Sequence, residues 1–251
     1  MDVVSAWVAP TLLLGLRIAP VFSFAPPFTL VRLPALVRVL MALGIAASLA
    51  SGAFGPAPVI DLAPGPLLVS AVRELLLGTI FVLAFQLAFA ALYVAGRTID
   101  IQAGFGLALL IDPTSRSQTP LVGTLFAYAA GLIFFAADGH LQLIRLFAAS
   151  LEAVPLGTAR LPETVAPLAA FAGFAFSTAL GAAGATILML FVADLAIALL
   201  SRTVPQMNVL VLGFQVKTLL MLAVLALSFG VAAALIARLM AATLSAIPGL
   251  F

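Results

Sequence analysis

The run from Val209 to Ala237 reads VLVLGFQVKTLLMLAVLALSFGVAAALIA, and Lys217 is its single charged residue. A helix needs about 20 apolar residues to cross the hydrocarbon core of a bilayer, so this run is long enough to span it. Five further stretches have the same character, at residues 3–28, 39–57, 67–95, 121–137 and 165–200. As one helix, residues 165–200 would be about 54 Å long. We therefore expect this stretch to protrude from the bilayer or to break near Gly181–Gly184.

The composition of the 251-residue chain agrees with these runs, since 65% of the residues are hydrophobic and 8% are charged. Soluble domains carry roughly 25% charged residues, and disordered chains need low hydrophobicity. A soluble monomeric enzyme and a disordered chain are therefore both excluded. An integral membrane protein, or a chain buried inside an oligomer, remains. We predict an all-α protein with about six long apolar helical segments.

The charges give no sign of a nucleic-acid partner, but their distribution predicts the orientation of the chain in the membrane. The net charge is +2 and the charges are scattered singly, so the chain offers no basic patch for nucleic acid. The first, third and fifth connections carry Arg32, Arg38, Arg97 and Arg202, whereas the second carries only Asp61. Basic loops face the cytoplasm by the positive-inside rule. We therefore predict that the N-terminus lies outside.

One stretch fits no span. Residues 98–120 read TIDIQAGFGLALLIDPTSRSQTP, and their apolar core, Ala103–Ile111, is too short to cross a bilayer. A non-spanning segment at membrane depth must be buried in protein or line a cavity. A phosphate loop is not indicated here, because the third glycine and a following Lys-Ser/Thr pair are missing. Gly104 and Gly106 instead suit a flexible constriction with unusual backbone angles.

The sequence contains few residues that could catalyse a reaction. His140 is the only histidine, there is no cysteine, and no Gly-x-Ser-x-Gly motif is present. We expect a capping or interfacial histidine at the end of the fourth segment. No catalytic, cofactor-binding or metal-binding residue is predicted, so the chain is expected not to be an enzyme.

Ionisable side chains inside apolar helices are costly and are usually paired. Asp194 lies eleven residues before Pro205 and Lys217 lies twelve after it, so an antiparallel hairpin puts them at the same depth. A structural ion pair and a proton relay both fit this placement. Arg73 and Glu74 are adjacent and point to different helix faces, so each has a partner elsewhere or reaches the membrane surface.

A stripe of small residues repeats every four positions in the fifth segment. Such stripes allow close approach of helices. We interpret it as a packing face, within the chain or toward a partner. Its members are Gly173, Ser177, Gly181 and Ala185.

Several strings, taken in order, carry a resemblance. They are RIAPVF from Arg17, GRTIDIQAGFG from Gly96, QTP from Gln118, DGH from Asp138 and SRTVPQMN from Ser201. Together they resemble the FliR family over most of the chain, from about Leu12 to Ser228. This family comprises the R component of the flagellar type III export gate and the T component of virulence injectisomes.

The resemblance implies an all-helical, multi-pass protein of the bacterial inner membrane, in the flagellar basal body. It implies assembly with P-like and Q-like subunits and with other membrane proteins of the type III export apparatus, within the lipid bilayer. Residues 1–164 would be the P-like part, and residues 165–251 the Q-like hairpin and tail. A plug at about 103–119 would close the channel through which unfolded flagellar proteins pass. The plug residues would be Gly104, Phe105, Gly106, Leu107, Leu109, Leu110, Ile111, Asp112 and Pro113.

We therefore predict a non-enzymatic subunit that forms and plugs this export channel. The alternative is a small secondary transporter with a buried Asp194–Lys217 site. A transporter should give saturable uptake of a small solute by the chain alone, and a gate subunit should not. An intramembrane hydrolase lacks a nucleophile and base.

Overall fold

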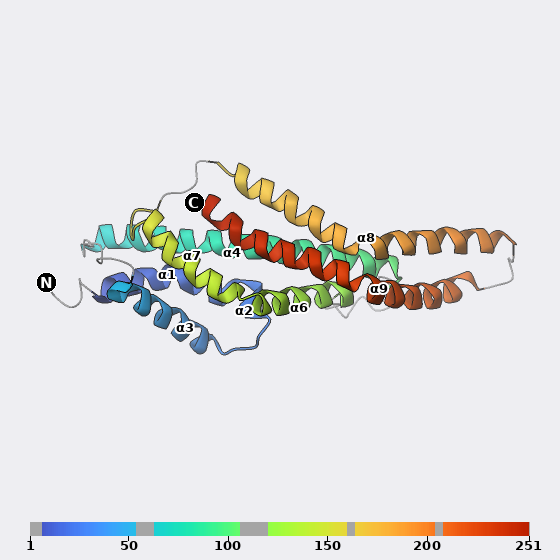
Figure 1. Ribbon diagram of the computed structural model, residues 1–251, viewed down its shortest axis with the longest axis horizontal. Helices are drawn as coiled ribbons and strands as arrows, with labels where there is room; N and C mark the ends of the chain where they lie inside the picture. Colours follow the sequence, from blue (N-terminus) through green and yellow to red (C-terminus); the bar gives the residue numbers. More distant parts are fainter. Residues whose placement is uncertain (1–6, 54–62, 106–119, 160–163, 204–207, 251) are drawn as a thin grey trace. The chain divides into compact units, whose positions relative to one another are not determined.

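The computed structural model describes residues 7–53, 63–105, 120–159, 164–203 and 208–250 (Figure 1). Every regular element in these ranges is a helix, which confirms the all-α prediction. A π-helical turn, Leu49–Ala53, and a 3-10 turn, Ile247–Gly249, accompany the α-helices. The α-helices are α1 (Ala9–Phe24), α2 (Pro26–Thr29), α3 (Ala35–Ser48), α4 (Pro64–Gln102), α6 (Leu121–Ala136), α7 (Gly139–Ala153), α8 (Ala166–Thr203) and α9 (Val209–Ala246).

Three of the described helices, α4, α8 and α9, are long and apolar enough to cross a membrane. Helices α6 and α7 qualify together, but they are bent by 70° at the break between them. Helices α1 and α3 are apolar but have only 16 and 14 residues. All six predicted apolar stretches therefore contain helix, and within the described residues at most four of them reach spanning length.

From residue 166 on, the apolar stretch 165–200 lies within one continuous helix, α8. It continues for 38 residues through Gly181–Gly184 without interruption, so the expected break there is absent. At 1.5 Å per residue its length is about 57 Å, well beyond the hydrocarbon core of about 30 Å. A helix of this length that crosses a bilayer close to its normal extends past the apolar layer.

The chain forms two compact units, each built from separate stretches of sequence. Unit 1 comprises residues 1–87, 134–172 and 240–251, and unit 2 comprises residues 88–133 and 173–239. The predicted division into a P-like part and a Q-like part at 164/165 is a different kind of boundary, based on a resemblance. It stays a prediction.

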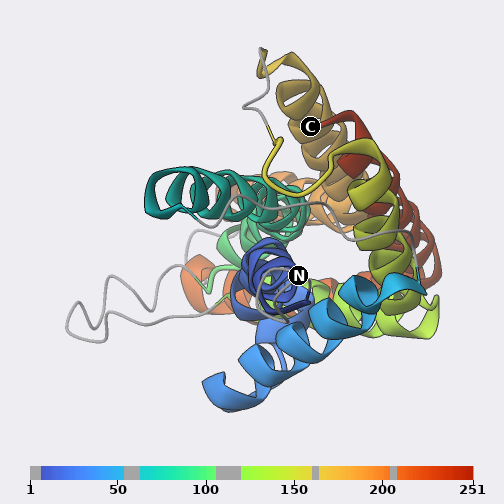
Figure 2. The same cartoon turned by 90° about the vertical axis from the view of Figure 1, so that its left-hand side faces the viewer.

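In unit 1, α1 and α3 lie side by side, as both views show (Figures 1 and 2). An aromatic cluster joins α2 to the α6–α7 junction, since the Phe28 ring meets Phe134 and Phe135 edge-on at centroid distances of 6.1 and 5.9 Å. Phe85 of α4 joins the same cluster through Phe134. Helices α1 and α4 touch through their backbones, because a Cβ on Gly78 would collide with the carbonyl oxygen of Arg17.

In unit 2, α8 and α9 form an antiparallel hairpin that leaves much apolar surface uncovered. Its buried side chains include Ala175, Ala179 and Met221. Large apolar side chains on the outer faces are exposed, with Leu219 at 70% and Leu227 at 87%. Exposed apolar area of this kind indicates a lipid or protein environment around the helices.

Candidate functional site

The predicted plug lies only partly within the described residues. Gly104 and Phe105 belong to them, whereas Gly106, Leu107, Leu109, Leu110, Ile111, Asp112 and Pro113 lie outside. The structure therefore describes the two ends of this segment, at Phe105 and at Pro120. Its candidate site is the place where α4 stops and α6 begins.

Helix α4 ends in a glycine-dependent turn. Gly104 has a φ of +96°, in the left-handed region that favours glycine. The N–H of Phe105 donates to the carbonyl of Asp100 over 3.0 Å, and the N–H of Gly104 donates to that of Ile101 over 3.1 Å. This pair of bonds is the Schellman motif, which closes a helix and redirects the chain. The chain thus leaves the axis of α4 directly before the predicted plug.

The start of the predicted plug rests on α9. The Phe105 ring meets the Phe214 ring edge-on, with 6.0 Å between centroids. A Cβ on Gly104 would come within 3.0 Å of the same Phe214 ring. Gly104 therefore suits this contact for two reasons: it adopts the positive φ, and it lets the Phe214 ring approach the backbone closely.

The start of α6 is held by a carboxylate from α4. Both oxygens of Asp100 accept the N–H of Val122 at 3.1 Å, and the N–H of Gly123 also donates to this carboxylate. Asp100 is only 5% exposed. The first N–H groups of a helix lack partners within it, and an acidic side chain there stabilises the helix by about 1 kcal/mol. Asp100 thus acts as the N-terminal cap of another helix.

Helices α4 and α6 cross in backbone contact just beyond this cap. A Cβ on Gly96 would collide with the backbone of Gly123, and a Cβ on Gly123 would lie 2.9 Å from the carbonyl oxygen of Tyr93. We call Gly96, Asp100, Val122 and Gly123 the neck. The neck fixes where the segment between the two helices begins and ends.

The structure brings the predicted pair Asp194 and Lys217 together. Nζ of Lys217 on α9 and Oδ1 of Asp194 on α8 form an ion pair within unit 2. The side chain of Lys217 is 18% exposed and that of Asp194 is 44% exposed. The pair is thus only partly covered by this chain, and a lipid or protein environment would complete its burial.

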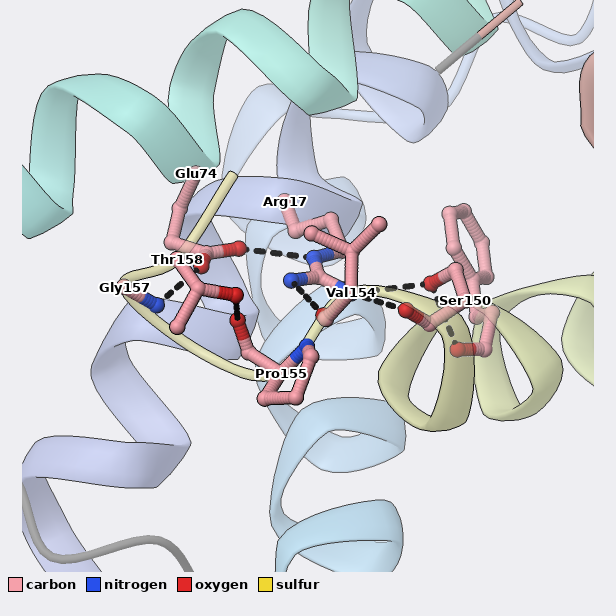
Figure 3. Close-up of polar contacts among 8 residues, drawn as sticks. Arg17, Glu74, Ser150, Val154, Pro155, Gly157 and Thr158 are labelled. Atoms are coloured by element: carbon pink, nitrogen blue, oxygen red, sulfur yellow. Dashed lines mark hydrogen bonds and ion pairs between the residues drawn. The ribbon is translucent and has the colours of Figure 1, made fainter. Parts of the chain in front are cut away.

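A second ion pair, which the sequence did not predict as a pair, lies in unit 1. Nε of Arg17 on α1 donates to Oε2 of Glu74 on α4 over 2.6 Å, and neither side chain is exposed to solvent (Figure 3). Arg17 also donates to the hydroxyl and carbonyl oxygens of Ser150 and to the carbonyl of Val154, each over 3.0 Å. The guanidinium is therefore bound on several sides.

Glu74 extends this network to the connection after α7. Its Oε1 accepts the N–H of Gly157 over 2.7 Å, and Gly157 has a φ of +78° (Figure 3). Arg73, the neighbour of Glu74, donates to the carbonyl of Gly157 over 3.0 Å. The signal in the sequence was a single charge, Arg17, in one apolar run and the adjacent charges Arg73 and Glu74 in another, but nothing in the spacing joins positions 57 apart.

The remaining predicted positions have simple surroundings. The His140 ring lies 5.7 Å from the Phe135 ring, and its buried Nδ1 has no hydrogen-bond partner among the described residues. No group of three or more potential metal ligands occurs in that same part of the chain. The small-residue stripe is exposed, and the buried face of α8 is formed by other residues, such as Ala175 and Ala179. The exposed members are Gly173, Ser177, Gly181 and Ala185.

Comparison with known proteins gives a consistent picture. Residues 8–243 match the family described as bacterial export proteins, family 1. The chain is 31% identical over 214 residues to a flagellar biosynthetic protein FliR of Pectobacterium carotovorum subsp. carotovorum, covering 84% of this chain and 80% of the relative. It is 30% identical over 200 residues to FliR of Escherichia coli (strain K12), covering 79% and 76%. It is also 30% identical over 188 residues to the Yop proteins translocation protein T of Yersinia pestis, covering 72% and 71%.

Proposed function

The chain belongs to family 1 of the bacterial export proteins, and we propose that it forms and plugs the protein-conducting channel of a flagellar type III export gate. The coarser assignment, a component of a type III export apparatus, follows from family membership. The flagellar assignment is supported by the FliR relatives of Pectobacterium carotovorum and Escherichia coli, which match 84% and 79% of the chain, whereas the Yersinia pestis translocation protein matches 72%. A structural role in export, rather than catalysis, fits this family.

One observation carries the plugging role. Helix α4 stops at a left-handed glycine immediately before an apolar stretch, and α6 restarts in backbone contact with α4. Residues 106–119 thus connect two helices that cross in backbone contact. Apolar constrictions close channels by excluding water, and they leave no fixed polar bonds that a passing chain must break.

The partners follow from the exposed apolar faces of α8 and α9. Leu188, Leu219 and Val231 are each more than 60% exposed. A channel wall built from several subunits needs such faces on the side turned to its neighbours, and the exposed small-residue stripe of α8 suits close helix contact. We propose P-like and Q-like gate subunits as these neighbours in the inner membrane, with lipid covering the remainder.

Assays of membrane leak with plug variants test this function. We expect Phe105→Ser combined with Leu109→Ser to leave the subunit assembled with its P-like and Q-like partners. The membrane of the host cell should then leak ions and small solutes. Leu132→Ser is the matched control, because Leu132 is an apolar α6 residue that is 73% exposed and outside the segment. A tight membrane in cells that contain the assembled double variant contradicts the plugging role.

The alternative, a small secondary transporter, uses the Asp194–Lys217 pair. The structure gives this pair a ready explanation as mutual neutralisation of two charges on neighbouring helices. Reconstitution of the chain alone in vesicles separates the two functions. Saturable uptake of a small solute supports the transporter, and its absence together with co-purification of gate partners supports the gate.

A further inference from the structure

We propose that the connection between α2 and α3 binds the headgroup of an anionic phospholipid through Arg32 and Arg38. The proposal goes beyond the export function and does not depend on the plug. Arg32 lies three residues before α3, which begins at Ala35, and Arg38 lies in the first turn of α3. Both arginines belong to unit 1. The site is therefore formed within one compact unit by residues that are close in sequence.

Arg32 and Arg38 carry positive charges that no acidic side chain balances in the described part of the chain. Neither is a member of the two ion pairs found there. Residues 7–53 contain no Asp or Glu, so the first turn of α3 has no acidic residue either. The Arg32 side chain is exposed and makes no hydrogen bond among the described residues. The connection thus presents two positive charges to a ligand outside the chain.

The Arg38 side chain is held in place beside α1. Its Nη1 donates to the carbonyl of Ser23 over 3.0 Å, at the C-terminal end of α1, where the helix dipole favours a positive charge. Its buried Nε has no hydrogen-bond partner among the described residues. A guanidinium has five N–H donors. Arg38 is therefore positioned by its bond to α1 and keeps donors for an anion.

The side chains around the two arginines are apolar and exposed to an unusual degree. Phe24, Leu36 and Leu40 are each more than half exposed. Arginine next to exposed apolar side chains suits the boundary of a bilayer, because the guanidinium reaches the headgroups while the apolar side chains lie among the acyl chains. A water-soluble anion would match the charges but would leave the apolar side chains in water. A phospholipid covers both.

The charge of the headgroup decides which phospholipid fits. Guanidinium groups bind phosphate oxygens through two parallel hydrogen bonds. The phosphate of phosphatidylglycerol has no positive group beside it, whereas that of phosphatidylcholine is balanced by its own ammonium group. The first connection is also predicted to face the cytoplasm, where anionic lipids attract basic segments. We therefore expect a preference for phosphatidylglycerol.

The test measures lipid binding by the full chain, purified in a non-ionic detergent, with native mass spectrometry after addition of phosphatidylglycerol or phosphatidylcholine. We expect phosphatidylglycerol to bind at least about tenfold more tightly, and Arg32→Gln combined with Arg38→Gln to abolish this preference. Arg145→Gln combined with Arg202→Gln is the matched control, because it removes the same charge from two exposed arginines elsewhere. The control should keep the preference.

The single variant Arg32→Gln decides the matter if the double variant does not fold. It breaks no hydrogen bond among the described residues, so it should fold and reduce the preference by about threefold. An unchanged preference in the folded arginine variants overturns the proposal. An equal loss in the control also overturns it, because the effect would then follow from net charge alone.

Two further results would replace the lipid by another ligand. If inorganic phosphate displaces phosphatidylglycerol at equal concentration, the arginines bind a free anion, and the proposal of a lipid site is wrong. If the double variant keeps the lipid preference but no longer co-purifies with export-gate partners, this face binds protein, and the proposal is wrong as well.

Discussion

Arg17 and Glu74 are fully buried charges in a chain that has few charges. Removing an arginine and a glutamate from water costs several kcal/mol each, which their attraction offsets only with good geometry and further hydrogen bonds. Both conditions hold, because the 2.6 Å bond between them is surrounded by bonds to Ser150, Val154 and Gly157. The pair fixes α1, α4 and the connection after α7 at one point.

Loss of one member of this pair should be costly. Glu74→Ala leaves the Arg17 guanidinium buried without a counter-charge, and breaking a buried pair in this way costs about 3–5 kcal/mol. We expect a large drop in the thermal stability of the detergent-purified protein. Arg73→Ala is the control, because Arg73 is the adjacent residue and its bond to Gly157 is exposed. Equal stability of the two variants would show that the Arg17–Glu74 bond is not needed for the fold.

The Asp194–Lys217 pair makes a different prediction, because it is only partly covered by this chain. Asp194→Ala should impair assembly by leaving Lys217 unpaired between helices, and adding Lys217→Ala should partly restore it. Co-purification with the gate partners measures this. If the two losses simply add in the double variant, the residues do not act as a pair.

Among the elements, the length of the apolar runs predicts the helices well, but it does not predict where the chain bends between them. The apolar run at 121–137 predicts α6, but the chain bends by 70° between Ala136 and Gly139 and continues as α7, where the run predicts only the end of a segment. The Asp194–Lys217 pair could be predicted because one turn sets the depth of both residues. The Arg17–Glu74 bond and the Asp100 cap could not, since periodicity within a segment says nothing about which segments meet.

The crossing of α4 and α6 gives a prediction about elements. Gly96→Ala puts a Cβ into the backbone of Gly123, so the helices must separate, at a cost of about 1–3 kcal/mol. Gly230→Ala on α9 is the control, since nothing lies within 4 Å of its Cβ. There the higher helix propensity of alanine should stabilise by up to about 1 kcal/mol. Thermal unfolding of both variants checks this, and similar midpoints would contradict the close crossing.

For the molecule as a whole, the composition excludes a soluble globule, and the exposed apolar faces of the described helices agree with this. Apolar side chains cover the outer faces of α8 and α9 as well as the interiors of the two units. Such a chain is completed by lipid or by other subunits. Which of these covers a given face does not follow from the sequence, because both environments select the same side chains.

Orientation in the membrane is testable because the chain contains no cysteine. The basic connections predict that the N-terminus lies outside and the connection after α8 lies in the cytoplasm. A cysteine introduced at Asp2 should react with an impermeant thiol reagent added to intact cells, and one at Arg202 should react only after the cells are opened. The reverse pattern would overturn the predicted orientation.

The central claim is that the stretch between α4 and α6 closes a protein-conducting channel. Electrical recording from the purified, assembled gate in a planar bilayer tests it most directly. The account predicts that the gate with the complete chain passes almost no current, and that the gate with residues 106–110 deleted conducts steadily at the same subunit composition. Equal, negligible conductance of the two assembled gates would contradict it.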